Sequence, residues 1–174
     1  INCHFTMPEL QSALSAAKET TPGHDNINYT TLRHLPTSLH KQLLDCANNI
    51  WHTGIIPAPL KHSIITPLLK PGKDPLESSS YRPIALTSCV GKIIERMVSN
   101  RLKYHMESSS ILPNEQCGFR QGRCTTDNLT RLADDIHKAT RHHKKVIAVF
   151  IDLNKAFDRR HPVTLLNKLH HRGI

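Results

Sequence analysis

The chain has no apolar run long enough to form a membrane-spanning helix. One of its longest runs, Val146 to Ile151, is far shorter than the roughly 20 residues that such a helix requires. A basic amphipathic helix with a clean aromatic face is also missing, which argues against attachment to a membrane surface. The first residues do not have the pattern of a signal peptide, and from the start at Ile1 and the abrupt end at Ile174 we expect a piece of a longer protein.

The cysteine and histidine patterns do not predict a disulfide framework or a metal site. The 5 cysteines are odd in number and include no C-x-x-C pair, so neither a disulfide scaffold nor a zinc ribbon is indicated, which fits a reducing compartment. Among the 13 histidines, the pairs His142–His143 and His170–His171 lie among Lys and Arg without H-x-x-x-H spacing. We interpret these pairs as solvated basic surface.

Acidic residues are few relative to basic ones. The chain has 14 Asp and Glu against 23 Lys and Arg, a formal net charge of +9 and a pI near 9.6. Its 174 residues suffice for one domain with a hydrophobic core, or for a part of a larger protein. Because a membrane is the weaker option, the charge indicates nucleic acid as the partner.

Local patterns predict a mostly helical chain with one hairpin. Apolar residues at helical spacing indicate helices over about residues 6–18, 37–52 and 89–104, another around 129–139, and a last one from Pro162. The first helix begins with a capping box at Thr6 and Glu9. Residues 63–69 and 82–87 are short β-rich segments that each contain a proline, so we expect them to form an exposed hairpin.

The segment VIAVFIDLNKAFD (146–158) places a carboxylate directly after an apolar run. Residues 146–151 are typical of a strand that is covered on both faces, where an isolated charge is costly. Asp152 is therefore either a helix N-cap or a ligand for a cation, and the strand alone does not separate these alternatives. Magnesium prefers oxygen ligands and is commonly held by one or two carboxylates plus substrate phosphates.

Five segments, which follow the order of the family along the chain, resemble the reverse transcriptases of non-LTR (LINE-type) retrotransposons. FIDLNKAFD (150–158) resembles their motif A, and LLNKLHHRGI (165–174) resembles the tail of that motif. YRPIALTSCVGKIIERMVSNRL (81–102) and QCGFRQGRCTTDNL (116–129) resemble two preceding blocks, with Cys124 in place of a serine. TPGHDNI (21–27) resembles an amino-terminal segment of the family, although His24 and Asn26 differ from it.

The resemblance implies roles for the residues of motif A. Asp152 would be a catalytic metal ligand, assisted by the carbonyl of Leu153. Phe157 would be the steric gate that selects deoxynucleotides by crowding the 2′-OH, or a core residue, or both. Asp158 is left between a direct role in the site and a local cap or salt bridge, and Arg159, Arg160 and His161 depart from the family pattern after it.

The resemblance also implies a nucleotide-binding hairpin and a template-binding loop. Lys70 and Arg82 match the positions that grip the incoming triphosphate, the alternative being ordinary surface solvation. Arg120 and Arg123, on a glycine-flanked loop before a helix, suit backbone phosphates of the template. The Asp134–Asp135 pair in LADDIH is not the catalytic pair of the family, because it precedes motif A, lacks the aromatic residue and lies on the outward side of a helix.

Together these expectations describe an α+β right-hand polymerase: fingers and a partial palm, mostly helical, with a fingers β-hairpin and one palm strand. Residues 1–60 would be a helical extension, 61–144 the fingers and 145–174 the start of the palm, with the rest of the palm and the thumb outside this chain.

The implied function is RNA-directed DNA polymerisation, with this piece inactive alone; the alternative is a non-catalytic basic RNA-binding remnant. The implied cofactor is two Mg²⁺ ions, with Mn²⁺ as a substitute. The implied partners are template RNA, DNA primer, deoxynucleoside triphosphates and the rest of the polyprotein, and the implied location is the nucleus and cytoplasmic ribonucleoprotein.

Overall fold

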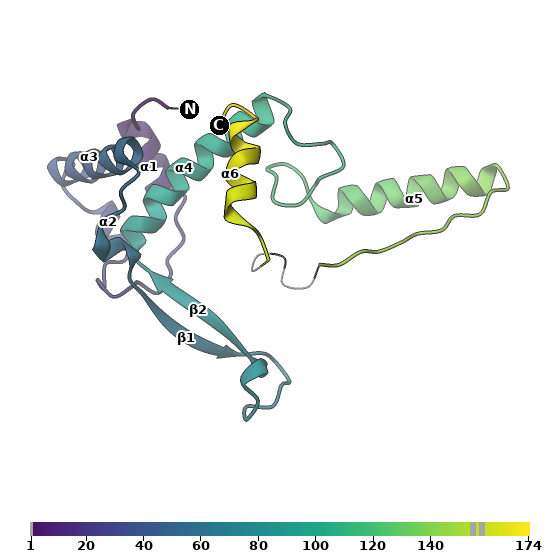
Figure 1. Cartoon of the computed structure of the whole chain (residues 1–174), viewed down its shortest axis with the longest axis horizontal. Coiled ribbons are helices and arrows are strands. Elements are labelled where there is room, and N and C mark those ends of the chain that lie inside the picture. Colours follow the sequence, from purple (N-terminus) through teal and green to yellow (C-terminus); the bar gives the residue numbers. More distant parts are fainter. Residues whose placement is uncertain (1, 154–155, 157–158) are drawn as a thin grey trace. The chain divides into compact units, whose positions relative to one another are not determined.

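The structure is a computed structural model that describes residues 2–153, 156 and 159–174 (Figure 1). It divides into two compact units, an N-terminal unit at Asn2–Leu102 and a C-terminal unit at Lys103–Ile174. Each unit is described here by itself. Within the described residues, no helix combines the length and apolar character needed to cross a bilayer.

The N-terminal unit is built from helices around one core. Its helices are α1 (Met7–Ser15), α2 (Tyr29–Arg33), α3 (Thr37–Thr53) and α4 (Cys89–Ser108), whose last residues enter the C-terminal unit. The helices expected over residues 6–18, 37–52 and 89–104 are therefore confirmed. Glu9 accepts a hydrogen bond from the Thr6 N–H at 2.8 Å, as the capping box predicted. The buried core is formed by Phe5, Leu10, Ala13, Leu14, Ala17, Tyr29, Leu32, Ala47, Cys89, Ile93, Ile94 and Met97.

Two glycines are required by their positions in this unit. Gly54 ends α3 with φ +68°, a left-handed conformation that suits a residue without Cβ. At Gly23 a Cβ atom would lie 2.7 Å from both the Ser88 N and the Thr87 carbonyl carbon. The segment 21–27 therefore packs directly against the backbone at the start of α4.

Arg101 of α4 joins the amino-terminal segment to the core. Its Nε lies 2.6 Å from Glu9 Oε1 and its Nη2 lies 2.9 Å from Glu9 Oε2, and its Cζ is 4.1 Å from the centroid of the Phe5 ring. It also donates hydrogen bonds to the carbonyls of Cys3 and His4. The hydrogen bonds from Arg101 lower the pKa of Glu9 from 4.5 to about 2.

The expected hairpin is confirmed. Strands β1 (Ser63–Leu69) and β2 (Tyr81–Thr87) pair antiparallel, with Ser63 opposite Thr87 and Leu69 opposite Tyr81. The hairpin projects away from the helices of its unit (Figure 1). Short 3₁₀ helices, η1 (Ala58–Lys61) and η2 (Ser78–Ser80), precede the two strands.

The C-terminal unit contains α5 (Thr125–Arg141), α6 (Pro162–His170) and long irregular segments. The two helices expected in this part of the chain are confirmed, but the core position expected for the apolar side of α5 is not. Leu129 and Ile136 are 60% and 41% exposed. The outward orientation expected for Asp134 and Asp135 is confirmed, since both are exposed.

The palm strand expected at residues 146–151 is wrong for the part of the chain that the structure describes. These residues form no strand, and Ile147 and Phe150 are 90% and 84% exposed. The physical reason is that a strand needs a hydrogen-bonded neighbour, whereas the one described sheet contains only β1 and β2. These residues are apolar, but the burial expected from their composition does not occur.

The observed architecture is thus α+β, mostly helical with one two-stranded hairpin. The division of the chain at residues 60 and 144 into parts of a polymerase stays a prediction.

Candidate nucleic-acid interface

The register of the hairpin places Lys70 and Arg82 on one face. Arg82 lies directly opposite Leu68, and the Lys70 N–H donates to the Ser80 carbonyl at 2.8 Å, which continues the pairing by one residue. Since side chains alternate between faces, Lys70 lies on the same face as Leu68 and therefore as Arg82. The two cations are diagonal neighbours across the strands, a geometry in which side chains come within reach of a shared anion.

The two cations differ in their surroundings. The Arg82 side chain is exposed, whereas Lys70 is half-buried and its Nζ donates to the Ser79 carbonyl at 2.6 Å. Lys70 must exchange this carbonyl for a ligand oxygen before it can bind a triphosphate through Nζ. The connection between the strands is held by Tyr81, whose hydroxyl donates to the Pro75 carbonyl at 3.0 Å.

The loop of residues 113–123 is fastened by Arg120. Its Nε and Nη2 donate to the two carboxylate oxygens of Glu107 at 2.8 and 2.7 Å, and its Nη1 donates to the carbonyls of Pro113 and Gln116. Only 8% of the Arg120 side chain is exposed. The hydrogen bonds from Arg120 hold the pKa of Glu107 below its usual value. The guanidinium of Arg120 is thus already occupied, so direct phosphate binding by it stays a prediction.

Arg123 is more available than Arg120 for a phosphate. Within the described residues its one hydrogen bond is a long one, 3.5 Å from Nη2 to the Asn114 side chain. The backbone carbonyl of Asn114 accepts a separate hydrogen bond from the Arg131 side chain of α5 at 2.9 Å. A planar guanidinium with free donors is well suited to bidentate binding of phosphate oxygens.

Asp152 and Leu153 are both exposed and follow the irregular segment 146–151. Phe157 and Asp158 lie outside the described residues. Within the described residues, no group of three or more His, Cys, Asp and Glu side chains is arranged to hold a metal ion. Asp152 offers a single carboxylate, and one carboxylate does not by itself make a two-metal site. The metal prediction for Asp152 therefore depends on ligands beyond those described.

The Asp134–Asp135 pair has the surroundings of an ordinary helix surface. Asp134 Oδ2 lies 2.5 Å from Lys138 Nζ, one turn along α5, and this bond raises the pKa of Lys138. Ion pairing along the helix surface gives Asp134 a local structural role, and Asp135 is exposed beside it.

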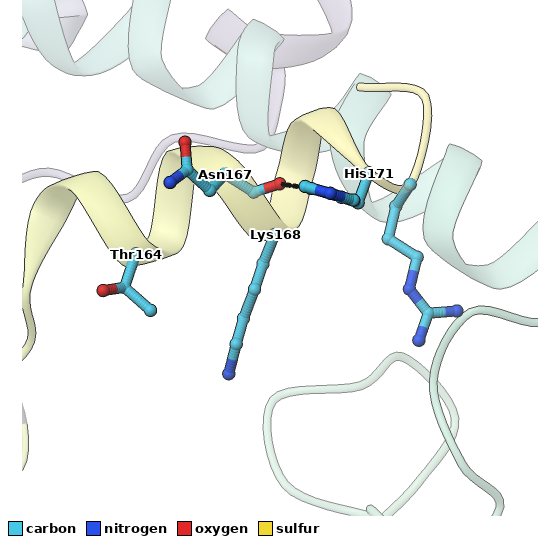
Figure 2. Close-up of a pocket in the computed structure, with 5 residues that line it drawn as sticks. Thr164, Asn167, Lys168 and His171 are labelled. Atoms are coloured by element: carbon cyan, nitrogen blue, oxygen red, sulfur yellow. Dashed lines mark hydrogen bonds between the residues drawn. The ribbon is translucent and has the colours of Figure 1, made fainter.

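A polar and basic stripe on α6 was not predicted from the sequence. Figure 2 shows a pocket lined by this helix and by the two residues that follow it, and the side chains of Thr164 and Lys168 extend from the same side of the helix. The pocket has a volume of about 460 Å³, and the His171 Nδ1 donates to the Asn167 carbonyl at 2.7 Å beside it. The signal was present in the sequence as helical spacing of polar residues. The lining residues are Thr164, Asn167, Lys168, His171 and Arg172.

The stripe has the chemistry of a phosphate-binding surface. It combines an ammonium, a guanidinium and neutral hydrogen-bond donors, the groups through which proteins contact nucleic-acid backbones. A neighbouring pocket of about 200 Å³ extends it past the start of the helix to Arg160 and His161. The basic character expected for His170 and His171 as solvated surface agrees with their exposure.

Comparisons with known proteins give one consistent family. Residues 68–174 match the family model described as reverse transcriptase (RNA-dependent DNA polymerase). The chain is 37% identical over 150 residues, 86% of its length, to a probable RNA-directed DNA polymerase from transposon BS of Drosophila melanogaster. It is 37% identical over 138 residues, 79% of its length, to one from the X-element of the same species. It is 33% identical over 155 residues, 88% of its length, to the RNA-directed DNA polymerase from mobile element jockey of Drosophila funebris. The chain spans only 17%, 15% and 17% of these three proteins.

Proposed function

The chain belongs to the reverse transcriptase family, as a domain of the non-LTR retrotransposon type, and from this we propose that it supplies the fingers and the first part of the palm of an RNA-directed DNA polymerase. The complete protein would copy RNA into DNA by nucleotidyl transfer from deoxynucleoside triphosphates, in the nucleus and in cytoplasmic ribonucleoprotein. Its partners would be template RNA, DNA primer and the remainder of the polyprotein.

The observation that carries this proposal is the hairpin face within the matched residues. The pairing of β1 with β2 places two cationic residues, Lys70 and Arg82, as diagonal neighbours on one face of a projecting hairpin. A triphosphate has several anionic oxygens, which a point charge and a bidentate donor can bind together. We assign these two residues to the triphosphate and assign Arg123 to a template phosphate, with Arg120 holding the loop that carries it.

Motif A would contribute through Asp152 and the carbonyl of Leu153. Magnesium, when bound in the complete protein, activates the primer hydroxyl and stabilises the leaving oxygen. Asp152 would hold that ion as an oxygen ligand, and Phe157 would crowd the 2′ position of the sugar. The described residues do not complete the site, so the remaining ligands would come from other parts of the protein.

A second candidate function is favoured by the charge of the chain. The net charge of +9 and the basic stripe on α6 would allow the chain to bind RNA without catalysis. Both candidates give RNA affinity that falls steeply with salt, because each depends on phosphate contacts.

The two candidates are separated by primer extension with the full-length protein. We expect Asp152→Asn to abolish extension and to leave RNA affinity unchanged, because it removes a ligand charge and no phosphate contact. The matched control is Asp135→Asn, which neutralises an exposed carboxylate on α5 and should leave extension unchanged. Full activity in the Asp152 variant would refute its metal role, and a full-length protein that binds RNA but extends no primer would favour the binding remnant.

A further inference from the structure

Phe119 combines two features that are each unfavourable for a phenylalanine. Its backbone is left-handed, with φ +60°, a conformation in which a bulky side chain is an outlier. Its ring is 93% exposed, so none of the usual gain from burying an aromatic side chain is realised. The other non-glycine residues with positive φ among the described ones are Asn26, Ser110 and His143, all polar.

The loop around Phe119 imposes this presentation of the ring. On one side Cys117 is buried, with 3% exposure. On the other side Arg120 is bound to both oxygens of Glu107 and to two carbonyls of the same loop. Cys117 and Arg120, which flank Gly118 and Phe119, are therefore held in place, and the Phe119 ring between them is exposed. Backbone strain that persists because its surroundings over-determine it is typical of ligand-binding sites.

The residue before the ring leaves space beside it. Gly118 has no positive φ, and a Cβ atom added to it would meet no atom within 4 Å. Neither conformation nor packing within the described residues thus requires glycine at this position. The surface at Gly118, next to Phe119 in the chain, is therefore open, and Arg123, with its weakly engaged guanidinium, belongs to the same loop.

We propose that Phe119 is a base-stacking residue, which receives an unpaired nucleobase of the template RNA while Arg123 contacts an adjacent phosphate. The inference rests on the proposed function, since it takes the ligand to be the template strand. Single-stranded nucleic acid is bound by this combination of an exposed aromatic face and nearby cations, because every base has a face that can stack. Arg120 acts as a positioning residue, since its donors bind the loop.

The test measures the affinity of the full-length protein for a single-stranded template RNA at fixed salt. Phe119→Ala should weaken binding by about 5- to 150-fold, the range for loss of one stacked base. Phe119→Trp should retain binding, because it keeps an aromatic face. The matched control is Tyr104→Ala, which removes an aromatic ring that is 76% exposed on α4 and should leave the affinity unchanged.

Two further measurements separate stacking from other roles of the ring. The effect of Phe119→Ala should vanish on an RNA with abasic sites in the bound stretch, and equal weakening on that RNA would overturn the proposal. Phe119→Ala should leave the salt dependence of binding unchanged, whereas Arg123→Ala should reduce its slope by about one phosphate contact. Unchanged RNA affinity in Phe119→Ala would also overturn it and would point to a protein surface as the partner of the ring.

The outcome for Phe119 can be distinguished from that for the proposed function. If the wild-type protein extends a primer and Phe119→Ala binds RNA normally, only the stacking inference fails. If the wild-type protein neither binds RNA nor extends a primer, the proposed function fails, and the inference fails with it.

Discussion

Replacing Gly23 by alanine tests the close approach between the segment 21–27 and the start of α4. The new Cβ would lie 2.7 Å from Ser88 N and from the Thr87 carbonyl carbon, where ordinary contact begins at 3.4 Å. Both atoms belong to the backbone, and Ser88 and Cys89 are buried, so neither side can move cheaply. Overpacking of this kind costs about 1–3 kcal/mol.

The net loss of stability from Gly23→Ala should be smaller than the overpacking cost. Alanine also lowers the conformational entropy of the unfolded chain, which stabilises the folded state by about 0.4–1 kcal/mol. We therefore expect the free energy of unfolding to fall by about 1–2 kcal/mol and the melting temperature of the 174-residue chain to fall by about 2–8 °C. Urea unfolding followed by Trp51 fluorescence would measure this, because Trp51 packs against Phe5, with 5.2 Å between ring centroids.

A matched glycine substitution provides the control. Gly91 lies in α4, and a Cβ there would meet no atom within 4 Å. Gly91→Ala should therefore raise the free energy of unfolding by up to about 1 kcal/mol through helix propensity. If Gly23→Ala were as stable as the wild type, or if both variants shifted stability in the same direction, the packing argument would be refuted.

Three other outcomes follow from the described contacts. The folded-state pKa of Glu9, lowered to about 2, gives stability that is fully present above pH 4.5 and is lost as the pH falls toward 2. The full pKa shift corresponds to about 3 kcal/mol, and solvent screening of the one-third exposed carboxylate reduces this contribution to about 1–2 kcal/mol. Urea titrations across this pH range should show the loss of stability. The variant Glu9→Gln should remove this pH dependence. Phe119→Gly should raise the free energy of unfolding by about 1 kcal/mol, because glycine adopts the left-handed conformation without strain; lower stability in urea would contradict the strain at this residue. The 174-residue chain alone should add no nucleotides to a primer in the presence of Mg²⁺, because the described residues form no metal-binding cluster, and measurable addition would contradict the domain prediction.

The features predicted from the sequence are those decided by local spacing. The capping box at Thr6, the periodicity of α3 and α4 and the proline-bearing strands all depend on neighbours within a few residues, and all are confirmed. The hairpin could also be predicted to hold Lys70 and Arg82 close to its turn, and only the register shows that they share a face.

The features missed depend on contacts that sequence spacing does not encode. Residues 146–151 have the composition of a buried strand, but strand formation needs a partner that composition does not supply. The pairing of Arg120 with Glu107 joins residues 13 positions apart across a loop. Because the sequence does not show this pairing, it predicts Arg120 as a cation available for template phosphate. The left-handed backbone at Phe119 lies next to that pairing and has no signal of its own in the sequence.

The two prolines of the hairpin occupy facing positions, and this affects how the hairpin meets other chains. Pro67 lies opposite Pro83, three pairs from the bond between Lys70 N and Ser80 O, so the alternation of an antiparallel ladder makes this a pair without internal hydrogen bonds. At such a pair the backbone nitrogens point to the outer edges, and proline has no hydrogen to offer there. Each outer edge of the hairpin therefore lacks one backbone N–H donor, at the position of the Pro67–Pro83 pair. A hairpin with exposed Ile64, Ile65 and Leu68 is thereby protected against adding a further strand and growing into an aggregate.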